Sequence, residues 1–171
     1  MTSTIDENPG EAQARRLEST HAQLAVLLQQ PDVAQRLRAA PGPDEWSAMQ
    51  VLGHLVEMLP YWLYHCNALM AAAEPPPFGR TLDAPERLAG VERGAVGNPD
   101  ELLRLLNDEV QAAAGAIRQM SAAERSKKGI HPRRGEMTVA EIVEVFIVAH
   151  TEDHLAQVRA TLSESRPAGS G

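Results

Sequence analysis

Residues 138–157, TVAEIVEVFIVAHTEDHLAQ, decide the fold class of this chain. Thr138 and Glu141 have the spacing of a capping box, in which each side chain accepts a hydrogen bond from the backbone N–H of the other residue, so a helix begins here. Apolar residues then recur at near-helical spacing, which is typical of a helix that packs one face against a core. The pattern predicts a helix from Thr138 to about Ser163.

Three earlier segments show the same periodicity, and each begins with residues that favour a helix start. The first opens with Asn8-Pro9-Gly10-Glu11 and the third with Asn98-Pro99-Asp100-Glu101, each with an N-cap side chain, a proline at the first helical position and an early acid. The second opens with the capping box Ser47-x-x-Gln50. We expect these helices to end near residues 28, 73 and 120. Pro60 should kink the second helix rather than end it.

The segments between the expected helices are connections in which no strand is predicted. Residues 74–97 are rich in proline and glycine and form a long connection, with one short helix near residues 85–91. Residues 121–137 form a polar loop, whose basic part at 125–134 is interpreted as a solvated surface.

The composition favours one helical domain. The chain has 171 residues, enough to bury a core, and only 4% of them are aromatic, whereas strands are enriched in aromatic and β-branched residues. We expect a single domain over residues 1–171, an all-α four-helix bundle with its core at about residues 10–163.

The charge and hydropathy of the chain exclude several classes of partner. The net charge of −7, without a basic stripe, argues against a nucleic-acid partner. No run approaches the ~20 apolar residues that cross a bilayer, and residues 1–16 lack the apolar core of a signal peptide. We therefore expect a cytoplasmic protein that does not associate with a membrane. Cys66 is the only cysteine, so no intrachain disulfide forms, and we expect its thiol to be buried and inert.

His150 and His154 are the first candidate site residues. They lie four positions apart on one face of the last helix, which places their Cβ atoms about 5–6 Å apart. Both imidazoles can then converge on one ion at ~2.0–2.1 Å. A hydrogen-bonded pair of core histidines is the alternative, since each ring must satisfy a donor and an acceptor.

His54, on the inward face of the second helix, can supply a third ligand. It lies seven positions inside that helix, counted from Ala48, and His154 lies about nine positions before the expected end of the last helix. These depths match if the two helices run antiparallel. An up-down-down-up bundle has that geometry, and it needs a long crossover between helices two and three, for which residues 74–97 are long enough.

Two blocks of sequence resemble the DinB-like family. Glu45-Trp46-Ser47 with Val51-Leu52-Gly53-His54-Leu55 is similar to the family's second helix, and Gly135-Glu136-Met137-Thr138 leading to His150-Thr151-Glu152-Asp153-His154 is similar to its last helix. The resemblance spans about residues 10–163. It implies an up-down-down-up four-helix bundle with a three-histidine site for a divalent metal ion, usually zinc or nickel. The matching metal ligands are His54, His150 and His154.

Three polar residues near these histidines have two interpretations each. Gln157 aligns with His150 and either orients a ligand or a bound water, or is a buried amide bonded to the backbone. Glu57 and Asp153 flank the ligands and either support them or are surface carboxylates, and the second interpretation is favoured.

The other histidines are not expected to reach the ion. His65 follows His54 by eleven positions, which places it about 16 Å further along the same helix. His21 is expected to be a hydrogen-bonded core histidine, and His131, in the loop before Pro132, is expected to face solvent.

Three histidines leave a divalent ion with an open coordination position, which is the pattern of catalytic sites. Such an ion can lower the pKa of a bound water or deprotonate a bound thiol. The resemblance favours the thiol, because members of the family use low-molecular-weight thiols as transferases or isomerases. A metal-dependent hydrolase of a small molecule is the alternative enzyme. A metal-binding or stress-related bundle without turnover, or one that mainly forms a homodimer, is the alternative of another class.

Overall fold

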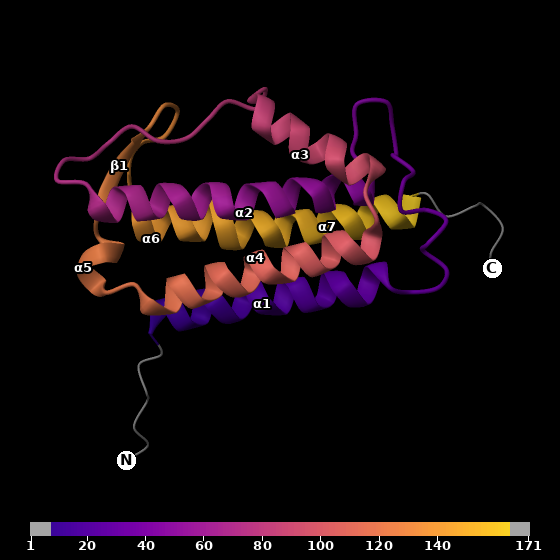
Figure 1. Ribbon diagram of the computed structural model, residues 1–171, viewed down its shortest axis with the longest axis horizontal. Helices are drawn as coiled ribbons and strands as arrows, with labels where there is room; N and C mark the ends of the chain where they lie inside the picture. Colours follow the sequence, from indigo (N-terminus) through magenta and orange to yellow (C-terminus); the bar gives the residue numbers. More distant parts are fainter. Residues whose placement is uncertain (1–7, 165–171) are drawn as a thin grey trace, which may run out of the picture.

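Four long helical segments lie side by side in the computed structural model, which describes residues 8–164 (Figure 1). They are α1 (Pro9–Leu28), α2 (Ala48–Ala71), α4 (Pro99–Gln119) and a last segment in which α6 (Val139–Ile142), η1 (Val143–Val148) and α7 (Ala149–Glu164) follow without a break. The predicted mainly helical class is confirmed. The fully buried side chains of these helices form one core, which includes Leu17, Leu55, Leu106 and Ile147.

The predicted capping residues start these helices. The Asn8 side chain accepts a hydrogen bond from the Gly10 N–H at 3.0 Å, and the Asn98 side chain accepts one from the Glu101 N–H at 3.1 Å. Both partners of the capping boxes at Ser47 and at Thr138 are present. α2 continues through Pro60 to Ala71, so the proline does not end the helix.

The last helix contains a feature that the sequence did not predict. Between α6 and α7, residues Val143–Val148 form the π-helical segment η1, in which the helix is wider than an α-helix. Such segments are rare in proteins, and those that occur often lie at functional sites. This one ends two residues before His150, so it sets the rotation with which the histidines of α7 face the bundle.

Contacts at the two ends of the bundle define the directions of α2 and the last helix. In the loop before α2, Arg36 donates a hydrogen bond to the carbonyl of Leu162 near the end of α7. At the other end, Lys127 donates to the carbonyl of Ala72, just after α2, at 3.0 Å. The two helices therefore run in opposite directions. In Figure 1, α1 and α6–α7 run from left to right, whereas α2 and α4 run from right to left.

The connection between α2 and α4 carries the helix α3 (Pro85–Val96), which is longer than the short helix expected near residues 85–91. α3 lies directly on α2 because glycines meet at the contact. A Cβ atom added to Gly94 would overlap the Met49 carbonyl, and one added to Gly53 would overlap the backbone of Gly94. This close approach fixes α3 beside the turn of α2 that carries His54.

The expectation that no strand forms is wrong. After the short helix α5 (Ala122–Arg125), the strands β1 (Lys128–His131) and β2 (Gly135–Thr138) pair antiparallel. The connection after α2 lies against β1, because the Ile130 N–H donates to the Pro76 carbonyl at 2.9 Å and the Phe78 N–H donates to the Ile130 carbonyl at 3.0 Å. The two strands form a local hairpin, and the bridge to Ile130 comes from a segment about fifty positions away, which a local pattern does not reveal.

Two further expectations concern Cys66 and membrane association. The Cys66 side chain is fully buried, as predicted, and burial raises its pKa to about 12, so its thiol stays protonated. Among the described residues, no helix has the length and apolar character that crossing a membrane requires.

Candidate metal centre

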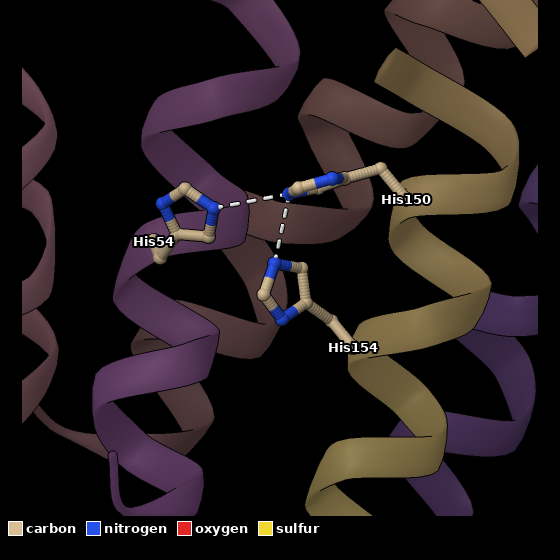
Figure 2. A group of neighbouring side chains, drawn as sticks. All are labelled: His54, His150 and His154. Carbon is tan, nitrogen blue, oxygen red and sulfur yellow. Dashed lines mark hydrogen bonds between the residues drawn. The ribbon is translucent and has the colours of Figure 1, made fainter. Parts of the chain in front are cut away.

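The three predicted ligands meet between α2 and α7 (Figure 2). His54 projects from α2, and His150 and His154 project from successive turns of α7. The Nε2 atom of His150 lies 2.9 Å from Nε2 of His154 and 3.4 Å from Nε2 of His54. One ring nitrogen from each histidine falls within a single group in which all separations are at most 4.8 Å. His54 is only 3% exposed, whereas His150 and His154 are half-buried, so the group reaches from the interior of the bundle toward its surface.

The arrangement of these nitrogens fits a divalent cation. At most one proton can lie between two ring nitrogens, so the Nε2 lone pairs of three neutral rings face one another without enough donors. A tetrahedral ion with bonds of 2.0–2.1 Å separates its ligand nitrogens by about 3.3 Å, close to the distance between His54 and His150. A shared cation would satisfy the three acceptors together.

Burial keeps the three imidazoles neutral, which is the form that binds a metal. Burial, with smaller contributions from the two other histidines, lowers the pKa of His54 to about 2. Burial lowers the pKa of His150 to about 4 and also lowers that of His154. Near neutral pH, no ring therefore has to lose a proton before it can act as a ligand.

Gln157 orients one of these rings. Its side-chain oxygen lies 2.8 Å from Nδ1 of His154, so Nδ1 carries the hydrogen and Nε2 keeps its lone pair for an ion. The helical spacing aligns Gln157 with His150, but the structure shows that its partner is His154, which is one turn closer. The Nδ1 atom of His54 is buried and has no hydrogen-bond partner among the described residues.

Trp46 closes one side of the histidine group. Its ring centroid lies 5.1 Å from that of His54, and its plane is stacked at 6.3 Å on the ring of His154. The sequence showed this tryptophan directly before the N-cap of α2 but gave it no role. A large aromatic residue two positions before a helix that carries a candidate ligand is the signal that was available.

Two polar neighbours of the ligands behave differently. Glu57 is not the expected surface carboxylate, because its side chain is 9% exposed and makes a bidentate ion pair with Arg80 at 2.5 and 2.6 Å. Arg80 of the crossover segment pairs with its carboxylate, and Glu57 is not a member of the histidine group. Asp153 is exposed, as expected for a surface carboxylate.

The remaining histidines lie outside the group. His65 packs its ring against Tyr61 at 4.6 Å. His21 is half-buried on α1, and a hydrogen bond with the backbone of Leu103 opposes the lowering of its pKa by burial. The expectation for His131 is wrong: it is 7% exposed and stacks on Phe146, because the hairpin folds it inward.

A cavity of about 250 Å³ adjoins the histidine group. His54 forms part of its wall, and α2, the crossover, the hairpin and η1 supply the other residues: Trp62, Arg80, Thr81, Leu82, Arg87, His131, Arg133, Arg134 and Phe146. The basic stretch 125–134 is predicted to be a solvated surface, yet two of its arginines line this cavity. No local pattern joins the arginines, since they come from three segments.

Comparisons with known proteins show the family and the fold. The DinB superfamily matches residues 16–158 of the chain. The structure is similar to that of YfiT from Bacillus subtilis, described as a probable metal-dependent hydrolase with an unusual four-helix bundle topology. The TM-score is 0.73 and the identity 18%, over 94% of this chain and 90% of YfiT.

A mutant of the mycothiol-dependent maleylpyruvate isomerase is also similar, with a TM-score of 0.63 and 14% identity. The match covers 95% of this chain but 62% of the isomerase, and at these identities both structures show a shared fold alone. No curated protein gives a significant match to the sequence. Because the family match covers most of the chain, the protein belongs to the DinB superfamily.

Proposed function

We propose that this protein is a metal-dependent enzyme that holds one divalent ion through His54, His150 and His154. The observation that carries the proposal is the convergence of three neutral imidazoles beside a cavity that His54 lines. Among the described residues, no fourth histidine, cysteine or carboxylate joins the group. A structural site would use such a group to close the coordination sphere, so an open position favours catalysis.

The proposed topology explains why the three histidines lie at the same depth along the axis of the bundle. In an up-down-down-up bundle, α2 and α7 are antiparallel and the crossover lies between α2 and α4. The start of α2 then lies beside the end of α7, which places His54 opposite His150 and His154. The same crossover carries Arg80 and Arg87 to the cavity.

The favoured reaction is the transfer or isomerisation of a small molecule with a low-molecular-weight thiol. A zinc or nickel ion, when bound, would lower the pKa of a thiol or water at its open position and so supply a nucleophile. The chain's own residues keep the ligands neutral, orient His154 through Gln157 and cover one side of the site with Trp46.

A metal-dependent hydrolase is the second candidate, and the observation that supports it is the structural similarity to YfiT. Hydrolysis gains from a carboxylate that takes a proton from the attacking water. Here Glu57 is engaged by Arg80 and Asp153 is exposed, so neither nearby carboxylate is placed for that role. A divalent ion can lower the pKa of a bound thiol or of a bound water without such a base, so the thiol-dependent reaction stays favoured by the family resemblance, and activity assays decide between the two.

Metal content decides the first part of the proposal. Wild-type protein should bind one divalent ion per chain, and His54→Ala should lower the affinity by more than a hundredfold, because changes to the partners of metal ligands already cost about 10–100-fold. His65→Ala is the matched control, since it removes an imidazole of α2 that lies outside the group. Wild-type protein that takes up no zinc, nickel, manganese or iron at pH 7.5 would refute the site.

Activity assays separate the two reactions. The metal-loaded protein is given electrophilic small molecules with and without a low-molecular-weight thiol. Turnover that requires the thiol and is lost in His54→Ala supports the transferase or isomerase. Turnover with water alone, equally lost in His54→Ala, would replace that reaction with hydrolysis.

A further inference from the structure

The cavity beside His54 has a charge opposite to that of the chain. The protein carries a net charge of −7, yet four arginines line this one cavity: Arg80, Arg87, Arg133 and Arg134. Arg80 is neutralised by Glu57. Within residues 8–164, no carboxylate forms an ion pair with any of the other three. Their charges face a cavity that is partly lined by rings, where an anion would gain more from them than in bulk water.

One cation of the cavity, Arg87, lies near the proposed metal site. The guanidinium of Arg87 lies 4.9 Å from the ring centroid of Trp46, which in turn contacts the His54 ring. The side chain is half-buried, and it donates a hydrogen bond to the Leu82 carbonyl at 2.6 Å. The packing of α3 on α2 through Gly94 fixes the helix that carries it. Arg87 is therefore a positioned cation rather than a freely moving surface side chain.

The second group of cations comes from the hairpin turn. Arg133 and Arg134 connect β1 to β2, and the Arg134 guanidinium lies 5.5 Å from the ring centroid of Phe146. Phe146 is itself stacked on Trp62 at 4.2 Å. These two rings lie on the wall of the cavity together with these cations, and they provide an apolar surface for the body of a ligand.

We propose that this cavity selects a dianionic small-molecule substrate, with one carboxylate at Arg87 near the metal site and a second at Arg133 and Arg134. The proposal rests on the proposed function, because it assigns the substrate class of the same site. Arginine binds carboxylates through paired, charge-assisted hydrogen bonds. Arg87 of α3 and the two arginines of the hairpin turn come from different elements and share the cavity wall with two rings, so they suit a short molecule with two carboxylates better than a single compact anion such as phosphate.

The test compares three probes by titration calorimetry with zinc-loaded and metal-free protein. Terephthalate carries a carboxylate at each end of a ring, benzoate carries the same ring with one carboxylate, and inorganic phosphate is a compact oxyanion. We expect terephthalate to bind at least tenfold more tightly than benzoate or phosphate, since a second charge-assisted contact is gained. This comparison needs no variant.

Variants locate the two carboxylate contacts. Arg87→Gln and Arg134→Gln should each weaken terephthalate binding about tenfold or more and leave benzoate binding less affected. Arg104→Gln is the control, because Arg104 is an exposed arginine of α4 paired with Asp108. Circular dichroism melting verifies that each variant is folded. Arg134 is exposed at a turn, so its replacement leaves the core intact.

Three results would overturn the proposal. Terephthalate binding no tighter than benzoate, phosphate binding as tightly as terephthalate, or equal effects of the arginine variants and Arg104→Gln would each refute a two-ended anion site. Zinc content is measured in the same preparations. Normal zinc binding without terephthalate selectivity refutes this inference alone, whereas absent zinc binding refutes the metal site itself.

Discussion

Glu57 and Arg80 allow a quantitative test of how the crossover is attached to α2. Their side chains are 9% and 11% exposed, and two hydrogen bonds of 2.5 and 2.6 Å join them. The Arg80 guanidinium also lies 3.9 Å from the ring centroid of Tyr61. Removal of one partner leaves a buried charge without compensation, which costs about 3–5 kcal/mol of unfolding free energy.

The perturbation is a double-mutant cycle with Glu57→Met and Arg80→Met. Methionine keeps much of the volume of either side chain and carries no charge. Each single variant should lose about 3–5 kcal/mol. The double variant should lose less than the sum, because it leaves no unpaired charge, and the coupling energy should be about 2–3 kcal/mol.

Equilibrium unfolding in urea at pH 7 measures these free energies. The matched control is the cycle on Arg104 and Asp108 of α4, which form an ion pair at 3.5 Å with side chains 64% and 63% exposed. That pair should show no measurable coupling, since solvent screens it. If the coupling between Glu57 and Arg80 is equally small, the buried pair does not hold the crossover, and the reasoning from burial is wrong.

Two further predictions concern stability. In metal-free protein, the free energy of unfolding should fall as the pH is lowered from 7.5 to 5.5. In the unfolded chain His54 and His150 become protonated near pH 6.5, whereas the folded pKa values of about 2 and 4 keep these rings neutral. The loss at pH 5.5 is about 1.4 kcal/mol per histidine. Urea unfolding at both pH values in the presence of a chelator measures it, and equal stabilities would contradict the lowered pKa values. Gly94→Ala should lower the free energy of unfolding by about 1–3 kcal/mol, since its Cβ atom would overlap the Met49 carbonyl. In Gly115→Ala the added Cβ atom meets no atom within 4 Å, so this variant should raise the free energy of unfolding by about 0.5–1 kcal/mol. Thermal melting of both variants tests this contrast, and equal shifts would show that α3 does not pack tightly on α2.

The long helices could be predicted because their causes are local. The capping boxes at Ser47 and Thr138 act within four residues, and apolar periodicity acts within one helix. The pair His150 and His154 is local for the same reason, since one helical turn brings the two side chains together. His54 required one further step, the matching of depths in two antiparallel helices.

The burial of the hairpin and the shape of the cavity could not be predicted, because their causes lie far apart in the chain. β1 pairs with residues of the crossover about fifty positions away, and this pairing turns His131 inward. The four arginines of the cavity come from the crossover, α3 and the hairpin turn, and no periodicity relates them. Glu57 had the appearance of a surface carboxylate until the crossover placed Arg80 against it. Helix identity and the histidine pair follow from interactions between residues close in sequence, whereas burial, charge pairing and the cavity depend on which distant segments come to share one volume.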